Sequence, residues 1–250
     1  MERYFDWQVK VGATRHLGGL KATEELVKSC NISKNKRVLE IGCGVGLTLC
    51  YVSRKYDCRI VGIDILENMI KEALRKVKKY NIDRKVDLVM ADAQNLPFRE
   101  ESFDIVFGES VNVFIEDKLK AMKEYARVVK QGGYIGFNEG TWIKLPPENV
   151  RKYLFKLSSM VLETYDKWIK LLMDSGLKVI FTRVYRIKYS DELTSIKIYG
   201  IRDSLKVILK FMFLLMKSHE TRAFIMRMWK FQLKNLSKYL GYGIYVGKKL

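Results

Sequence analysis

Proline and histidine are scarce in this sequence, with 3 Pro and 2 His among 250 residues. Proline and glycine are together too few for a linker-rich or disordered chain, and 48% of the residues are hydrophobic. The composition is therefore that of a globular protein. Its length suffices for one α/β domain with a sizeable core and an additional element.

Cysteine is also sparse, and none of the thiols has the spacing of metal ligands. The four cysteines are Cys30, Cys43, Cys50 and Cys58, and no two of them form a C-x-x-C pair. Isolated thiols in an enzyme-like chain are typical of a reducing cytoplasm. The first residues, MERYFDWQVKVG, lack the apolar core of a signal peptide. We therefore expect a cytoplasmic protein with no bound metal.

Acidic residues are rare only in the last part of the chain. The formal net charge is +18. The first 150 residues contain 25 Lys and Arg against 21 Asp and Glu, whereas the last 100 contain 21 against 7. Such a basic segment fits nucleic acid, an anionic membrane or an acidic substrate as its partner. It equally fits a solvated surface that favours lysine.

Short β-branched runs alternate with helical patterns over most of the chain, which indicates βαβ units and a parallel sheet. The expected strands are 37–41, 59–63, 86–90, 103–108, 134–138, 177–187 and 241–249. The expected helices lie around 46–55, 67–80, 118–130 and 162–175. A glycine pair at 132–133 is expected to end the third of these helices. The pattern predicts an α/β fold with a mostly parallel seven-stranded sheet flanked by helices.

The segment VLEIGCGVG, residues 38–46, joins a strand to a helix through a tight glycine turn. Gly42 and Gly44 let the backbone pass close to a ligand beside the helix N-terminus. A dinucleotide-binding turn requires G-x-G-x-x-G, but here the third glycine, Gly46, comes one position early. Glu40, at the end of the strand, repels a pyrophosphate and attracts an ammonium or sulfonium. The turn therefore predicts a cationic cofactor.

Acidic residues also stand where three further strands end. Asp64 follows the second strand, Asp92 the third and Glu109 the fourth. Asp64 can accept both hydrogen bonds of a ribose diol, and Asp92 is placed to contact adenine. One such acid alone is most often a solvated loop residue. A series of them behind a glycine turn indicates a shared ligand site.

Taken in order, VLEIGCGVG, GIDI, ADAQNLPF, FDIVFGES and EYARVVKQGGYIGFNE resemble the class I, Rossmann-like methyltransferases that use S-adenosylmethionine, in particular their type 11 small-molecule branch. The resemblance covers roughly residues 35–140. It implies S-adenosylmethionine as the cofactor, with the methionine end at the glycine turn, the ribose at Asp64 and the adenine at Asp92. The expected cofactor contacts are Glu40, Gly42, Gly44, Asp64, Ile65, Asp92, Ala93 and Glu109.

The resemblance implies a methyltransferase that acts on a small or lipophilic molecule. Methyl transfer is an in-line displacement, so positioning and desolvation can supply most of the catalysis. A general base is needed only where the acceptor must first lose a proton. GESV, residues 108–111, stands where base-methylating relatives carry N/D-P-P-Y, which argues against nucleic acid as the acceptor. Two alternatives stay open: an RNA methyltransferase, favoured by the positive charge, and a non-catalytic cofactor-binding or interaction protein.

Four residues are candidates for contact with the acceptor. His16 precedes a glycine pair that lets the leading segment fold over the cofactor mouth, and it can be a base, an orienter, or a surface or capping histidine. Glu109 and Glu139 are catalytic candidates that can stabilise a cationic amine or cap the segments that follow their strands. Trp142 can stack on the acceptor or belong to the core.

About 50 residues separate the last two expected strands, more than a hairpin needs. In SLKVILKFMFLLMK (204–217), the lysines Lys206, Lys210 and Lys217 fall within about 40° of one another on a helix. In TRAFIMRMWKFQLKNLSKYL (221–240), four more basic residues share a stripe: Arg227, Lys230, Lys234 and Lys238.

These patterns predict two units. Residues 1–189 and 241–250 form the cofactor-binding domain, and residues 190–240 form a helical insertion. The insertion can pack on the sheet as a lid, with its lysines merely solvated. It can also lie at a membrane surface through residues 204–240, as a peripheral contact. The first of its helices is too short and too charged to span a bilayer.

Overall fold

The computed structural model describes residues 16–187, 201–219, 221–223 and 238–250, together with Phe5, Gln8, Val9, Met226 and Leu236. Its strands are β1 (Arg37–Ile41), β2 (Arg59–Asp64), β3 (Val86–Met90), β4 (Phe103–Glu109), β5 (Val129–Trp142), β6 (Glu163–Thr164), β7 (Lys178–Arg186) and β8 (Leu240–Lys248). Its helices are α2 (Gly19–Ser29), α3 (Leu47–Tyr56), α4 (Glu67–Lys79), α5 (Lys118–Val128), α6 (Glu148–Ser158), α7 (Tyr165–Asp174) and α10 (Ile201–Lys217). A 3₁₀ turn, η1 (Asn112–Phe114), follows β4.

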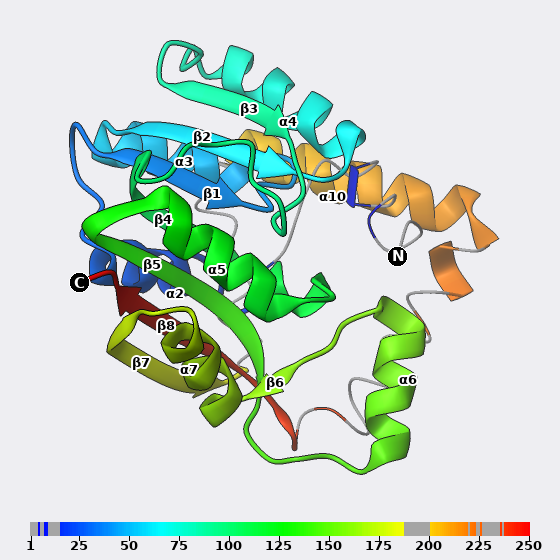
Figure 1. Ribbon diagram of the computed structural model, residues 1–250. Coiled ribbons are helices and arrows are strands. Elements are labelled where there is room, and N and C mark those ends of the chain that lie inside the picture. The colour runs from blue at the N-terminus through cyan, green and yellow to red at the C-terminus, as the bar shows by residue number, and fades with distance from the viewer. Residues whose placement is uncertain are drawn as a thin grey trace.

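The strands form one sheet, in the order β3-β2-β1-β4-β5-β8-β7 (Figure 1). The first five strands of this order are parallel. The last strand of the chain, β8, is antiparallel to both β5 and β7 and lies between them. Parallel strands bring their carboxyl ends to one edge of the sheet, which is where an open α/β sheet binds its ligands.

Helices cover both faces of the sheet. Side chains of α2, α3 and α4 pack in one apolar cluster, with Leu26, Leu49 and Val77 among its buried members. Side chains of α5 and α7 pack in a second cluster on the opposite face, with Met122 and Trp168 among them. The fold is therefore a three-layer α/β/α sandwich, as the alternating strand and helix patterns predict.

The predicted fold class is confirmed, with two corrections. The sheet contains eight strands rather than seven, because the two-residue strand β6 pairs with β5. The third predicted helix ends at Val128 rather than near 130, and β5 starts at Val129 instead of 134. The glycines at 132–133 do not end a helix but lie in a bulge, where the pairing of β5 with β4 shifts register. Gly132 supplies the positive φ, 73°, that this bulge needs.

The predicted insertion lies only partly within the described residues. α10 is helical, as expected for 204–217, and β8 begins at Leu240, as expected for the last strand. Residues 188–200, most of 220–237 and three of the four basic residues of the second predicted stripe lie outside the described residues. Among the residues that are described, no helix has both the length and the apolar character needed to cross a bilayer.

Candidate active site

The glycine turn after β1 is held tightly by its neighbours. Gly42 has a φ of 65°, and a Cβ built there would lie 2.4 Å from Cγ2 of Val111, in the segment after β4. Gly46, with a φ of 78°, is the cap residue before α3, and a Cβ there would lie 2.9 Å from the Cβ of Ala73 in α4. Only glycine fits at these two points, so the turn that joins β1 to α3 has a defined shape.

Glu40, in the strand before this turn, has a buried carboxylate. It is 3% exposed, and its Oε2 accepts no hydrogen bond from the described residues. Burial raises the pKa of Glu40 well above its usual 4.5, and the nearby carboxylates of Glu109 and Asp64 raise it further. A cation bound beside these three carboxylates would stabilise their ionised forms. These three carboxylates are therefore compatible with the cationic end of the predicted cofactor.

Asp64 closes the turn from the end of β2. Its Oδ2 accepts a hydrogen bond from the Gly44 amide at 2.9 Å, and its Oδ1 accepts one from the Leu66 amide, also at 2.9 Å. Burial raises the pKa of Asp64, and these backbone amides oppose the shift. A carboxylate can accept about four hydrogen bonds. Asp64 therefore keeps acceptor sites for a ribose diol.

Two apolar side chains stand exposed at the same edge of the sheet. Ile65 follows β2 and Met90 ends β3, and each is 61% exposed. Met90 is the register partner of Asp64. Exposed apolar groups beside a polar site suit the flat face of a purine. Ile65 is among the predicted cofactor contacts and Met90 is not, although Met90 ends the third predicted strand, next to the end of the second.

Asp92 lies in a tight turn after β3. Its Oδ1 accepts a hydrogen bond from the Gln94 amide at 2.8 Å. The turn continues into a loop that is fastened to α5: Glu124 accepts from the Leu96 amide at 2.8 Å, and Arg127 donates to the carbonyls of Leu96 at 3.0 Å and Phe98 at 2.7 Å. Arg127 lowers the pKa of Glu124.

The Glu124–Arg127 pair thus positions the loop that carries Asp92, and sequence reasoning missed it. Ala93, the other predicted contact in this loop, is half-buried and packs against the core. A side chain that reaches back across some thirty residues to two carbonyls leaves no periodic signal in the sequence.

Glu109, at the end of β4, joins three other elements. Its carboxylate accepts hydrogen bonds from Thr23 of α2 at 3.1 Å and from Thr48 of α3 at 3.1 Å. The Nδ1 atom of His16 lies 3.4 Å from Oε1 of Glu109, and its Nε2 atom lies 3.3 Å from the Thr23 hydroxyl. The structure therefore brings together His16 and Glu109, two of the three predicted catalytic residues, and adds two threonines.

The segment that leads into α2 is fixed at the carboxyl ends of β4 and β5. The Leu17 carbonyl accepts a hydrogen bond from the buried Asn138 side chain at 2.7 Å, and the Leu17 amide donates to Ser110 at 3.4 Å. Gly18 turns the chain with a φ of 80° against the ring of Tyr242. His16 is thereby held at the edge of the sheet where the glycine turn lies.

Glu139, the third predicted catalytic residue, holds the loop after β4. Its Oε1 accepts hydrogen bonds from the amides of Val111 at 2.9 Å and Asn112 at 2.7 Å, while its Oε2 has no hydrogen-bond partner among the described residues. Burial raises the pKa of Glu139 to about 7, although the amides oppose the shift. Trp142 is 6% exposed and belongs to the core.

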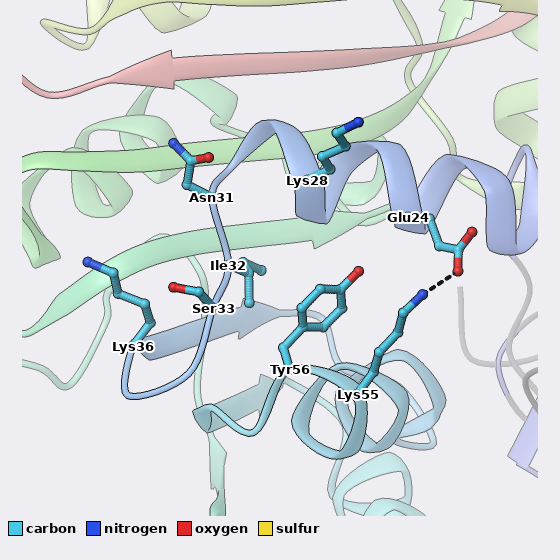
Figure 2. A pocket seen from close by; sticks show the side chains of 8 residues that line it. All are labelled: Glu24, Lys28, Asn31, Ile32, Ser33, Lys36, Lys55 and Tyr56. Atoms are coloured by element: carbon cyan, nitrogen blue, oxygen red, sulfur yellow. Dashed lines mark hydrogen bonds and ion pairs between the residues drawn. The ribbon is translucent and has the colours of Figure 1, made fainter.

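A hollow of about 690 Å³ lies away from these residues. Its lining comes from the ends of α2 and α3 and from the loop before β1, so it opens near the amino ends of the strands (Figure 2). Lys55 pairs with Glu24 at 2.6 Å beside it. None of the predicted site residues lines this hollow. Among the described residues, no group of three or more His, Cys, Asp or Glu side chains is placed to hold a metal ion.

The chain is similar to known methyltransferases in sequence and in fold. Residues 39–137 match a family described as "Methyltransferase domain". An uncharacterized protein of Haemophilus influenzae is 30% identical over 210 residues, which span 80% of this chain and 81% of that protein. Sterol 24-C-methyltransferase of Candida albicans is 34% identical over 118 residues, or 47% of this chain and 31% of that enzyme.

The solved structures agree on the fold. A methyltransferase of Thiobacillus denitrificans in complex with S-adenosylhomocysteine superposes with a TM-score of 0.73 at 18% identity, over 98% of each chain. This likeness confirms the predicted fold, and the sequence matches confirm the predicted resemblance to the methyltransferases. The chain belongs to the class I methyltransferases that use S-adenosylmethionine.

Proposed function

We propose that the chain transfers a methyl group to a small, lipophilic acceptor that enters at the carboxyl ends of the parallel strands. The observation that carries the methyl-donor part of this proposal is the buried Oε2 of Glu40, which accepts no hydrogen bond from the described residues and has the carboxylates of Asp64 and Glu109 nearby. Three neighbouring carboxylates favour a ligand that is positively charged where it meets the glycine turn.

Each part of the cofactor would contact a different set of the described residues. Glu40 would accept a hydrogen bond from the ammonium group of the methionine end, and Asp64 would accept from the ribose hydroxyls. Ile65 and Met90 would cover the adenine, with Asp92 at its edge. When bound, the sulfonium supplies an electrophilic methyl carbon to the acceptor. The chain's own contribution is then to orient the two reactants in line and to exclude water.

His16 is the residue best placed to take a proton where the acceptor must lose one. Its Nδ1 lies 3.4 Å from Oε1 of Glu109, so this carboxylate would stabilise the imidazole once it has taken the proton. In this proposal Glu109 orients His16, and Glu139 positions the loop that covers the site. The core position of Trp142 supports a packing role beside the acceptor more than direct stacking.

The lipophilic class of the acceptor is supported by one relative and by the predicted insertion. The Candida albicans relative is named as a sterol methyltransferase. We propose that residues 1–189 and 241–250 form the catalytic domain and residues 190–240 an insertion that serves the acceptor side. A peripheral membrane contact through 204–240, on a protein located in the cytoplasm, belongs to the same proposal.

An assay with a radiolabelled methyl group tests the acceptor class. The full chain would be incubated with labelled S-adenosylmethionine and, separately, with lipid, polar metabolite and RNA fractions of a cell extract. We expect label in the lipid fraction, and much less label with the Asp64→Ala variant. Label confined to RNA would overturn the proposed acceptor and support the RNA alternative, and label confined to the polar metabolites would overturn its lipophilic character.

Replacing Asp64 by alanine should weaken the binding of S-adenosylhomocysteine at least tenfold. A carboxylate that accepts two hydroxyl hydrogen bonds contributes on the order of 2–4 kcal/mol, because charged hydrogen bonds are worth about 1.5–3 kcal/mol each and overlap. Calorimetric titration measures the effect, with Asp87→Ala on the exposed face of β3 as the matched control. Tighter binding of NAD than of S-adenosylhomocysteine would contradict the assignment of the cofactor.

Replacing Arg127 by alanine should weaken the same binding about fivefold. The variant loses the donors that hold the Leu96 and Phe98 carbonyls, and ordering the Asp92 loop then costs about 1 kcal/mol more. The exposed Arg99, in the same loop, provides the control variant Arg99→Ala. If Arg127→Ala lowers the unfolding temperature but leaves the dissociation constant unchanged, the Glu124–Arg127 pair contributes to stability alone.

A further inference from the structure

Helix α10 exposes a continuous apolar stripe. Its exposed large residues recur at helical spacing, and the last of them, Met216, is 78% exposed. They are Leu205, Ile208, Leu209, Met212, Phe213 and Met216. Positions i, i+3, i+4, i+7, i+8 and i+11 share one face of a helix, so these side chains form a single surface about 16 Å long. We call it the α10 stripe.

A second face of α10 is less exposed. Val207, Phe211, Leu214 and Leu215 are half-buried, at the spacing i, i+4, i+7 and i+8. This face lies roughly opposite the α10 stripe. A helix that only packed on the protein would bury one apolar face and present polar residues on the other. α10 has apolar residues on both.

Lysines border the α10 stripe on one side. Lys206, Lys210 and Lys217 are all exposed and lie between the stripe and the half-buried face. The Lys217 ammonium lies 4.8 Å from the centre of the exposed Phe213 ring. Residues 204–219 contain no aspartate or glutamate. The complement of such a surface is apolar in its middle and negatively charged at its rim.

Helix α10 lies toward the edge of the sheet that carries the candidate active site. In Figure 1, α10 extends toward the side on which β1, β2 and β3 end. Helix α6 lies toward the same side, and it exposes Phe155 beside the exposed Arg151 and Lys156. Two separate segments thus present apolar and basic side chains where the acceptor would enter.

We propose that the α10 stripe docks the chain on an anionic lipid surface, with its apolar residues inserted among the acyl chains and its lysines at the headgroups. A basic amphipathic helix lies in the interface in this way without crossing it. The proposal rests on the proposed function only in its purpose, which is to bring a lipophilic acceptor to the cofactor. Docking itself depends on α10 alone.

Vesicle sedimentation of the full chain tests the docking. One set of vesicles is phosphatidylcholine alone, and the other is a two-to-one mixture of phosphatidylcholine and phosphatidylglycerol. We expect sedimentation with the anionic vesicles, reversed by high salt. The variant Lys206→Gln/Lys210→Gln/Lys217→Gln should bind about 100-fold more weakly, since each lysine near an anionic surface contributes about fivefold. Lys78→Gln/Lys123→Gln/Lys178→Gln, with exposed lysines elsewhere, should bind like the unaltered chain.

A second pair of variants tests the apolar part. Leu209→Glu/Phe213→Glu should lower vesicle binding at least tenfold, because two large apolar groups no longer enter the bilayer. Leu74→Glu/Met173→Glu, which changes two exposed apolar residues of α4 and α7, should leave it unchanged. Titration with S-adenosylhomocysteine is run on every variant, so that failure of docking is distinguished from failure of the cofactor site.

Three results would overturn the proposal. The first is no sedimentation with either kind of vesicle, and the second is equal sedimentation of the α10 variants and their controls. The third is that Leu209→Glu/Phe213→Glu converts a dimer to a monomer in analytical ultracentrifugation without changing vesicle binding. That last result would assign the α10 stripe to a contact between two copies of the chain.

Discussion

Replacing Glu40 by glutamine should weaken the binding of S-adenosylmethionine roughly 100-fold. The variant keeps the shape of the side chain but removes the charge that meets the ammonium group, and a charge-assisted hydrogen bond is worth about 1.5–3 kcal/mol. Calorimetric titration measures the loss. Glu100→Gln, at an exposed position, is the control.

The pH dependence of that binding follows from the raised pKa of Glu40. A bound cation favours the ionised carboxylate, so binding releases the proton that the free protein holds. Affinity should therefore fall as the pH falls through the pKa of Glu40 in the free protein, which lies above its usual 4.5. In Glu40→Gln this dependence should disappear. If the affinity of the unaltered chain and that of Glu40→Gln change with pH in parallel, the role given to Glu40 is contradicted.

Glu139 should make the folded protein less stable as the pH rises. Its pKa is about 7 in the folded chain and near the usual 4.5 in the unfolded chain, so the folded state binds more protons between these values. Stability from this group is fully present below about pH 4.5 and is lost by pH 7, a change of about 3 kcal/mol at 1.36 kcal/mol per pKa unit.

The variant Glu139→Gln isolates this contribution. A glutamine oxygen can still accept from the amides of Val111 and Asn112, but it does not titrate. Urea unfolding at several pH values would measure the difference in unfolding free energy between the two proteins, in which the other titrating groups largely cancel. We expect the variant to gain about 3 kcal/mol relative to the unaltered chain between pH 4.5 and pH 7. A difference that does not change with pH would refute the raised pKa.

The glycine turn and the strand-end acids could be predicted because their signals are local. Glu40, Gly42 and Gly44 occupy alternate positions of one strand and turn, and β1 and β3 have the predicted bounds. A run of β-branched residues indicates a buried strand, and the acidic residue lies at or directly after the end of that run. The order of these segments then carried the resemblance to the methyltransferase family.

The contacts of the Glu124–Arg127 pair with the Asp92 loop, and the bulge in β5, could not be predicted in the same way. Arg127 reads as a surface residue of a helix, and only the fold brings it to the Leu96 carbonyl. Gly132 comes soon after a helical pattern, so the sequence predicts a helix end there. The bulge in which it lies depends instead on the pairing of β5 with β4. Both features arise from contacts between segments that are distant in sequence.

Glu109 illustrates the same limit on a predicted residue. Its position at the end of β4 follows from the sequence, and that position suggests an exposed acid in a crevice. The structure instead surrounds its carboxylate with Thr23, Thr48 and His16. Its partners belong to different segments, so the orienting role that we propose for it could be inferred only from the tertiary fold.

A crystal structure of the chain with S-adenosylhomocysteine would show how the cofactor product is bound. We predict the ammonium group within about 3 Å of Oε2 of Glu40, which is hydrogen-bond distance. We also predict the ribose hydroxyls on Asp64 and the adenine between Ile65 and Met90. A ligand bound elsewhere, such as in the hollow beside Lys55 and Glu24, or bound with its ammonium group away from Glu40, would contradict this prediction.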